Sequence, residues 1–209
     1  MPLAEPREQP TPTIEPGPLA RIGSPLNVPN IITFSRLLLS ILLFWLIDQK
    51  DHWLAACIVF VVAASTDAID GYIARKYGLV TIIGRILDPF VDKVIIGGTF
   101  IFLVREADSG VNAWMAIIVI GREMFITSLR SFLESVGKDF SATWSGKIKM
   151  VLQCAAVTGS LLYLEYGRAS EYQSTLAGIR DVLLWSAVGV TIHSGVSYVQ
   201  RAVQLFREA

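Results

Sequence analysis

The stretch STDAIDGYIARKYGLVTIIGRILDPFVDK, residues 65–93, carries four aspartates between two long apolar segments. Residues 53–64 before it are all apolar, and residues 94–104 after it contain no charge. Apolar segments of this kind are typical of helices that cross a membrane. Because a charge inside a membrane helix is costly, carboxylates at the ends of such helices indicate function. This stretch therefore predicts two membrane helices joined at a polar site.

The composition agrees with a membrane protein. Of 209 residues, 53% are hydrophobic and 17% are charged, whereas soluble domains carry about 25% charged residues. Long apolar stretches alternate with short polar ones along the chain. The formal net charge is zero, so no global field attracts nucleic acid, and we expect no nucleic-acid partner.

The order of the apolar segments predicts an all-α integral membrane protein with six transmembrane helices. The segments cover about residues 31–47, 53–74, 86–104, 111–136, 148–164 and 182–205. Residues 25–30 alternate apolar and polar side chains, which predicts a short amphipathic N-terminal helix at the membrane surface. Residues 1–24 contain six prolines and few apolar side chains, so we expect a disordered tail. The chain then divides into this tail, 1–24, and one six-span membrane domain, 25–209.

The distribution of basic residues predicts which side each end faces. With the tail inside, the inner links and the C-terminal end carry Arg75, Lys76, Arg85, Lys138, Lys147, Arg201 and Arg207. The outer links carry Lys50, Arg105, Arg168 and Arg180. Lys and Arg are enriched on the cytoplasmic side of membrane proteins. We therefore expect a multi-pass protein of the cell (inner) membrane whose termini and aspartates face the cytoplasm.

The first two aspartates share a helix face. Successive helical residues turn by about 100°, so Asp67 and Asp70 lie one turn apart on the same side. Gly71 and Ala74 fall on nearly the same stripe, and Arg75 lies at its edge. Carboxylates flanked by such small side chains leave room for a flat group to lie against the helix backbone beside a metal ion.

The second pair of aspartates follows after a short link. Asp88 and Asp92 are four residues apart and also share a face. Because a short link makes its two helices antiparallel neighbours, we expect all four carboxylates at one depth, where they need a compensating charge. Oxygen-rich sites suit magnesium, manganese or calcium. In a simpler interpretation Asp88 caps a helix before Pro89 and Asp67 pairs with Arg75, but this leaves two buried carboxylates unexplained.

The full pattern of these residues resembles a known family. The string Asp67-x2-Asp70-Gly71-x2-Ala74-Arg75-x8-Gly84-x3-Asp88-x3-Asp92 is similar to the complete signature of the CDP-alcohol phosphotransferase family. The similarity covers 26 residues, and six spans after a cytoplasmic tail agree with the family fold. The resemblance implies an enzyme that transfers a substituted phosphate from a CDP-linked lipid to an alcohol, and it implies a homodimer.

The resemblance also implies roles for individual residues. It suggests two magnesium ions, with manganese as an alternative ion. The ligands would be Asp67, Asp70 and Asp88 for one ion, and Asp67, Asp88 and Asp92 for the other. Asp92 would also be the catalytic base for the acceptor hydroxyl, although a metal-bound carboxylate has low basicity and could chiefly orient that hydroxyl. The cytidine nucleotide would be bound by Asp67, Asp70, Gly71, Ala74, Arg75, Thr81 and Asn30.

Basic residues in the second half of the chain indicate a site for a phosphate. Arg122 and Arg130 lie about two turns apart on the fourth segment, and Lys147 and Lys149 stand at the start of the fifth. Arginine presents a planar fork that fits phosphate oxygens. In a simpler interpretation Arg130 pairs with Glu134 on its own helix, and the lysines only mark the cytoplasmic boundary.

This half is similar to the phosphatidylglycerophosphate synthase branch of the family. The similarity rests on Asn27-Val-Pro29-Asn30-Ile-Ile-Thr33-Phe-Ser-Arg36, on Arg122-Glu123 with Arg130, and on Gly146-Lys147-x-Lys149-x3-Gln153. It implies transfer of a phosphatidyl group from CDP-diacylglycerol to glycerol 3-phosphate, which yields phosphatidylglycerophosphate and CMP. We expect the acceptor phosphate to bind Arg122, Arg130, Lys147, Arg36 and Lys149.

Other functions fit parts of the sequence. Within the family, the acceptor could be phosphatidylglycerol, which would make the chain a cardiolipin synthase, or an inositol phosphate. A membrane prenyltransferase also binds a magnesium diphosphate at aspartate-rich helix ends, but Gly71, Ala74 and Arg75 favour a nucleotide. A divalent-cation transporter would carry acidic residues near mid-membrane, whereas these aspartates fall at one end of their spans.

Overall fold

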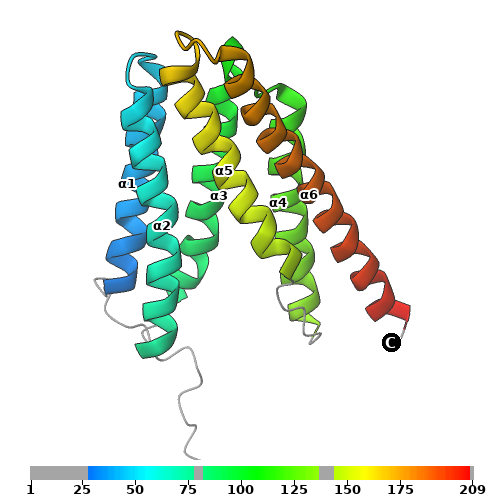
Figure 1. The fold of residues 1–209 in the computed structure, drawn as a ribbon. Coiled ribbons are helices and arrows are strands. Elements are labelled where there is room, and N and C mark those ends of the chain that lie inside the picture. The colour runs from blue at the N-terminus through cyan, green and yellow to red at the C-terminus, as the bar shows by residue number, and fades with distance from the viewer. Residues whose placement is uncertain (1–27, 78–81, 137–143, 208–209) are drawn as a thin grey trace, which may run out of the picture.

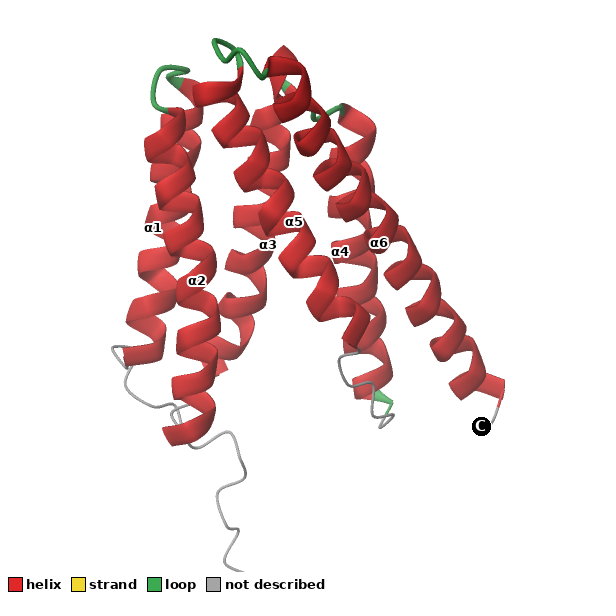
Figure 2. Cartoon of the chain, viewed as in Figure 1, coloured by secondary structure: helices red, strands yellow, loops and turns green. Residues whose placement is uncertain are grey.

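The chain forms a helical bundle in the computed structural model, which describes residues 28–77, 82–136 and 144–207 (Figure 1). Within these ranges the side chains of residues 28–30, 67–77, 82–86, 88, 144–145 and 206 lie outside the description. The elements are α1 (Val28–Asp48), α2 (Trp53–Tyr77), α3 (Ile82–Val104), the short η2 (Ala107–Ser109), α4 (Ala113–Ser135), α5 (Trp144–Leu162), the π-helical turn η3 (Tyr163–Gly167) and α6 (Gln173–Arg207). Helices and short links account for the described backbone (Figure 2).

The six predicted spans correspond to the six long helices, so the all-α membrane fold is confirmed. Within the described ranges, three stretches are long and apolar enough to cross a membrane by length and composition: Ile31–Asp48, Gly146–Gly167 and Gln173–Leu205. Trp53–Thr66 forms a shorter apolar stretch in α2. The predicted tail, residues 1–24, lies outside the described part of the chain, and so does 25–27 of the predicted surface helix.

Helix starts differ most from the sequence prediction. Val28 to Asn30 form the first turn of α1 and continue directly into the span. The last helix begins at Gln173, well before the predicted residue 182. Its polar first turns are helical because they pack on the preceding turn: the Arg180 guanidinium stacks 4.2 Å from the Tyr163 ring centroid. Hydropathy alone does not detect such a polar helix start.

The two ends of the bundle differ in character. At one end lie the links α1–α2, α3–α4 and α5–α6, and we call it the link end (Figure 1). The end of α2, the start of α3 and the C-terminus lie at the opposite end, which we call the aspartate end. The helices lie close together at the link end and spread apart toward the aspartate end (Figure 1). The signature aspartates therefore belong to the more open end.

One apolar core holds the bundle together. Leu43 of α1, Phe60 of α2, Phe100 of α3 and Val119 of α4 are fully buried in it, and α5 and α6 contribute further members. A second, smaller cluster joins α4 to α6 nearer the aspartate end. Close packing of this kind holds the helices against one another.

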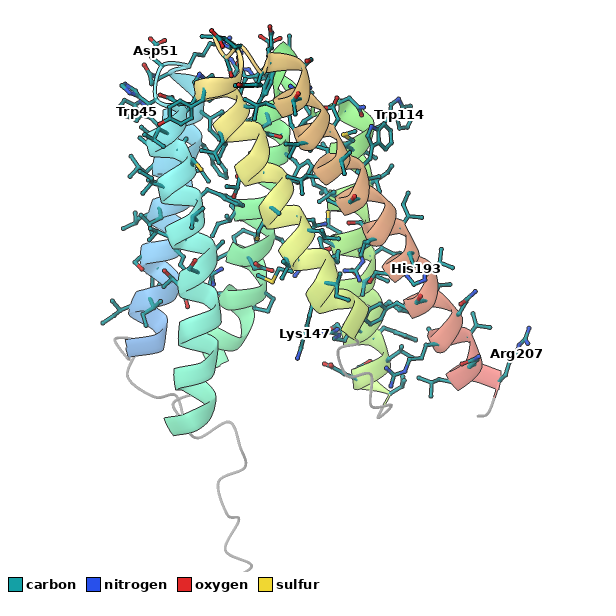
Figure 3. All side chains as sticks on the ribbon, in the orientation of Figure 1. Trp45, Asp51, Trp114, Lys147, His193 and Arg207 are labelled. Carbon is teal, nitrogen blue, oxygen red and sulfur yellow. The ribbon has the colours of Figure 1, made fainter. Side chains whose placement is uncertain are left out.

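The outer surface of the bundle is apolar, as expected for a protein surrounded by lipid. Leu38, Val151 and Val182 are each more than 60% exposed, and soluble monomers rarely present so much contiguous apolar surface. Trp45 and Trp114 are also exposed and lie near the link end (Figure 3). Tryptophans are enriched where a membrane meets water, so these two residues mark that boundary.

Ion pairs connect the links to one another at the link end. Asp48 pairs with Arg105 at 2.5 Å, Lys50 with Glu106 at 3.1 Å, and Arg168 with Asp108 at 3.1 Å. The backbone N–H of Leu54 donates to Glu165 at 3.2 Å. These contacts join segments that are distant in the sequence.

Candidate active site

The four signature aspartates fall on two adjacent helices at the aspartate end. Asp67 and Asp70 lie in α2, which continues as a helix to Tyr77, and Asp88 and Asp92 lie in α3. The two helices pack against each other, as the short link predicts. The side chain of Asp92 is described. The other proposed ligands and nucleotide contacts, Asp67, Asp70, Asp88, Gly71, Ala74, Arg75 and Asn30, have only their backbones described, and Thr81 lies outside the described residues.

A buried arginine lies near Asp92, the one signature aspartate whose side chain is described. Arg36 of α1 is 1% exposed, and its Nη2 is 3.9 Å from Asp92 Oδ1. A guanidinium buried in a membrane protein needs an anion close to it. Helix α1 therefore supplies a positive charge to the site that α2 and α3 form.

A second charged cluster surrounds Glu123 of α4. Glu123 Oε1 accepts a hydrogen bond from Arg122 Nη1 at 3.0 Å and another from Lys149 Nζ. The side chains of Arg122, Glu123 and Lys149 are 11%, 16% and 9% exposed. Two of the predicted phosphate-binding residues thus meet at one carboxylate that the sequence prediction did not place in the site.

Helix α6 contributes polar partners that sequence reasoning missed. Arg122 Nη2 donates to Ser194 Oγ at 2.7 Å, and Arg130 Nη2 donates to the Tyr198 hydroxyl at 3.2 Å. The Tyr198 ring also lies 5.3 Å from Arg122 Cζ and 5.9 Å from Arg130 Cζ. Ser194 and Tyr198 are four residues apart, so they share one face of α6. That spacing is visible in the sequence, but nothing local connects it with α4.

The contacts of Arg130 differ from the simpler sequence interpretation. In the described part of the chain Arg130 bonds to Tyr198, and no ion pair joins it to Glu134. Tyr198, which is 2% exposed, therefore fixes both arginines of α4 from the neighbouring helix. Among the residues whose side chains are described, the buried Nε atoms of Arg122 and Arg130 have no hydrogen-bond partner.

A cavity of about 10 Å³, which is room for about one water molecule, joins Asp92 to the charged cluster. Its lining residues are Asp92, Lys93, Ile96, Glu123, Lys149, Met150 and Gln153. Gln153 donates to Thr191 of α6 at 2.9 Å, which fixes its amide. The structure thus brings Asp92 and Lys149 to one cavity. Arg36 lies beside Asp92, and Arg122 bonds to Glu123. Lys147 is exposed at the start of α5 and lies at the same end of the bundle (Figure 3).

Both cationic and anionic side chains lie around this cavity. Among the described side chains, Arg36, Lys93, Arg122 and Lys149 supply four positive charges, and Asp92 and Glu123 supply two negative ones. Arginine and lysine side chains are the usual partners of phosphate oxygens in proteins. The carboxylates of α2 and α3 are hard oxygen donors of the kind that magnesium prefers. The residue types therefore fit both an acceptor phosphate and a divalent ion.

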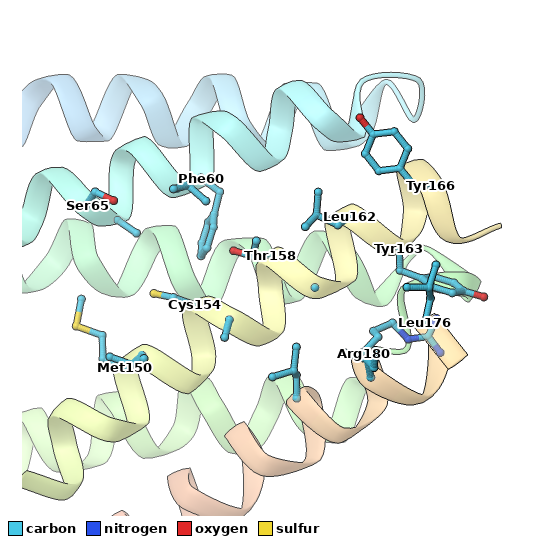
Figure 4. A pocket seen from close by; sticks show the side chains of 17 residues that line it. Phe60, Ser65, Met150, Cys154, Thr158, Leu162, Tyr163, Tyr166, Leu176 and Arg180 are labelled. Atoms are coloured by element: carbon cyan, nitrogen blue, oxygen red, sulfur yellow. The ribbon is translucent and has the colours of Figure 1, made fainter. Parts of the chain in front are cut away.

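A lateral groove opens on the side of the bundle between α2, α5 and α6. It has a volume of about 940 Å³ and an almost wholly apolar lining. Figure 4 shows that it extends from Ser65 and Met150 to Tyr166 and Arg180. Ser65 precedes Asp67 by two residues, and Met150 also lines the small cavity. The groove thus extends from the depth of the aspartate site toward the link end.

Together, the membrane bundle, the aspartate-bearing helix ends and the cation-rich cavity define a membrane enzyme that acts on phosphate esters. Comparison with known families agrees with this class. The family model described as CDP-alcohol phosphatidyltransferase matches residues 26–193. The chain belongs to the CDP-alcohol phosphatidyltransferase family.

Curated relatives resemble the chain over most of its length. A CDP-diacylglycerol–glycerol-3-phosphate 3-phosphatidyltransferase of Bacillus subtilis is 34% identical, covering 84% of this chain and 94% of the relative. An enzyme of the same name from Rickettsia bellii is also 34% identical, covering 86% and 97%. A probable phosphatidylglycerophosphate synthase of Mycobacterium tuberculosis is 32% identical, covering 91% and 88%. All three similarities extend through both the aspartate half and the basic half of the chain.

Proposed function

We propose that this chain transfers a phosphatidyl group from CDP-diacylglycerol to glycerol 3-phosphate, which forms phosphatidylglycerophosphate and releases CMP. The observation that carries the proposal is the cavity where Asp92 and the Arg122–Glu123–Lys149 cluster meet. We place the acceptor phosphate on those cations and its hydroxyl toward Asp92. The names of the relatives support the same donor and acceptor.

On the donor side, we propose that Asp67, Asp70, Asp88 and Asp92 hold two magnesium ions, with manganese as an alternative. Such ions neutralise a diphosphate and its leaving group. Gly71 and Ala74 leave the face of α2 open to the nucleotide, and Arg75, Thr81 and Asn30 complete its binding site. The Arg36 guanidinium, 3.9 Å from Asp92, offsets part of the negative charge that the four carboxylates concentrate there.

On the acceptor side, Arg122 and Lys149 bind the phosphate, with Arg36, Arg130 and Lys147 as further cations. The acceptor hydroxyl oxygen attacks the phosphorus that carries diacylglycerol, and a new phosphorus–oxygen bond forms. The bond between that phosphorus and CMP breaks, so CMP leaves with the electron pair. Asp92 orients the hydroxyl and takes its proton. Positioning of the two reactants supplies much of the rate enhancement in phosphoryl transfer.

The lateral groove accounts for the lipid part of the donor. Diacylglycerol chains are apolar, and the groove between α2, α5 and α6 extends from the aspartate depth along the membrane-spanning part of the bundle. We place one acyl chain there. We further propose that the aspartate end faces the cytoplasm of a cell (inner) membrane and that two copies of the chain form a homodimer.

CMP release by the purified chain in detergent tests the proposal. The reaction contains CDP-diacylglycerol and magnesium with one acceptor at a time: glycerol 3-phosphate, phosphatidylglycerol, an inositol phosphate or serine. We expect release only with glycerol 3-phosphate, loss of release in EDTA, and recovery on adding magnesium. Release with phosphatidylglycerol instead would assign a cardiolipin synthase, and release with none of the acceptors would contradict the proposed reaction.

A further inference from the structure

Glu123 is an acidic residue in the site to which the proposed reaction assigns no role. Its Oε1 accepts hydrogen bonds from Arg122 of its own helix, at 3.0 Å, and from Lys149 of α5. We propose that Glu123 is a positioning residue, which holds the Lys149 ammonium group at the cavity lined by Asp92 so that it binds the acceptor phosphate. This inference rests on the proposed function.

The contacts of the two cations show which one depends on Glu123. Arg122 has further contacts with Ser194 and with the Tyr198 ring, so it keeps its place without Glu123. Among the residues whose side chains are described, Glu123 is the hydrogen-bond partner of Lys149. Glu123 therefore acts chiefly through Lys149 and much less through Arg122.

A free lysine side chain is a poor anchor for a small substrate. Its four-carbon stem has many rotamers, and fixing them on binding costs conformational entropy. The Lys149 side chain is 9% exposed and lines the cavity with Asp92 and Gln153. Because Glu123 fixes the lysine before the acceptor arrives, that cost is met on folding rather than on binding.

A purely structural role for Glu123 makes a different prediction. In that case the carboxylate only neutralises a buried ammonium group, since an unpaired charge in a membrane protein is costly. Replacing Lys149 with a neutral residue would then cancel the effect that losing Glu123 has on KM for glycerol 3-phosphate. If Glu123 positions Lys149 for substrate, both losses instead remove the same interaction, and the double variant resembles the single ones.

Steady-state kinetics on Glu123→Gln, Lys149→Met and the double variant separate these two roles. We expect Glu123→Gln to raise KM for glycerol 3-phosphate about tenfold, as loss of one charge-assisted contact does. The kcat and the KM for CDP-diacylglycerol stay near wild type. The double variant has the same KM for glycerol 3-phosphate as Lys149→Met. Glu123→Asp keeps the charge but shortens the side chain, so its KM for glycerol 3-phosphate should lie between those of the wild type and Glu123→Gln. This variant replaces Glu123→Gln in the test if Glu123→Gln does not fold.

Glu106→Gln is the matched control, because Glu106 is 8% exposed and pairs with Lys50 at 3.1 Å at the link end. We expect it to leave KM for glycerol 3-phosphate unchanged. An unchanged KM in Glu123→Gln, or a wild-type KM in the double variant or in Glu123→Asp, overturns the positioning role. Failure of the wild-type chain to use glycerol 3-phosphate at all overturns the proposed function, and that result is seen before any variant is made.

Discussion

At the scale of single residues, Arg36 and Asp92 link the two halves of the site. Arg36 is buried in the first helix, 3.9 Å from the carboxylate of the last signature aspartate. Asp92 in turn lines the cavity that Glu123 and Lys149 enter from α4 and α5. One carboxylate thus stands between the proposed metal ligands and the acceptor cations, where a group that receives a proton from the acceptor must lie.

Replacing Asp92 with asparagine tests this position. Asparagine keeps the size of the side chain but removes its negative charge and most of its basicity. We expect kcat for CMP release to fall by roughly a hundredfold or more, because proton transfer by a placed side chain contributes about that much. Asp51→Asn at the link end should keep wild-type activity. An Asp92→Asn enzyme with more than a tenth of wild-type kcat would exclude Asp92 as base and as metal ligand.

At the scale of helices, close packing of α1 on α3 depends on Gly98. A Cβ atom at this position would lie less than 3.0 Å from Cζ of the Phe44 ring of α1, which is too close for two carbon atoms. That ring stacks on Phe102 of α3, with centroids 5.1 Å apart and planes 6° apart. The absence of a side chain at Gly98 therefore lets α1 approach α3 and brings Arg36 toward Asp92.

Gly98→Ala should consequently destabilise the protein. We expect a cost of about 1–3 kcal/mol, the usual range for overpacking a well-filled core, seen as a lower midpoint of thermal unfolding in detergent. Gly189→Ala is the matched control, since a Cβ there meets nothing within 4 Å, and alanine favours a helix over glycine. Equal midpoints for the two variants would contradict the packing account.

The helices were largely predictable from the sequence, and the cross-helix contacts were not. Apolar runs located all six spans, but the polar start of α6 at Gln173 was missed because Arg180 and Tyr163 stabilise it by a contact outside the hydropathy pattern. Their basic side chains and the resemblance to the synthase branch selected Arg122 and Lys149 as site residues. Neither could reveal that Glu123 joins them, or that Tyr198 contacts two arginines on α4, because these contacts depend on how α4, α5 and α6 pack.

At the scale of the whole molecule, the two ends of the bundle have different roles. Ion pairs such as Lys50–Glu106 and Arg168–Asp108 join the links at one end, where Trp45 and Trp114 mark the membrane boundary (Figure 3). The other end carries the aspartates and the cation-rich cavity. An enzyme that draws a lipid donor from the bilayer and a charged acceptor from water needs one such open end at the interface.

Cysteine labelling measures which end faces the cytoplasm. In a chain carrying Cys57→Ala and Cys154→Ala, single cysteines are placed by Asp51→Cys at the link end or Arg207→Cys at the aspartate end (Figure 3). A membrane-impermeant maleimide added to intact cells should label position 51, and position 207 only after permeabilisation, because basic residues gather at the cytoplasmic end. The opposite labelling pattern would reverse the proposed orientation.

The most direct measurement of the central claim follows radiolabelled glycerol 3-phosphate into lipid. Purified protein is incubated with CDP-diacylglycerol, magnesium and the labelled acceptor, and the chloroform-soluble product and CMP are quantified together. The account predicts one labelled phosphatidylglycerophosphate for each CMP released, and roughly a hundredfold less of both products with Asp92→Asn. CMP release without label in the lipid fraction would contradict glycerol 3-phosphate as the acceptor.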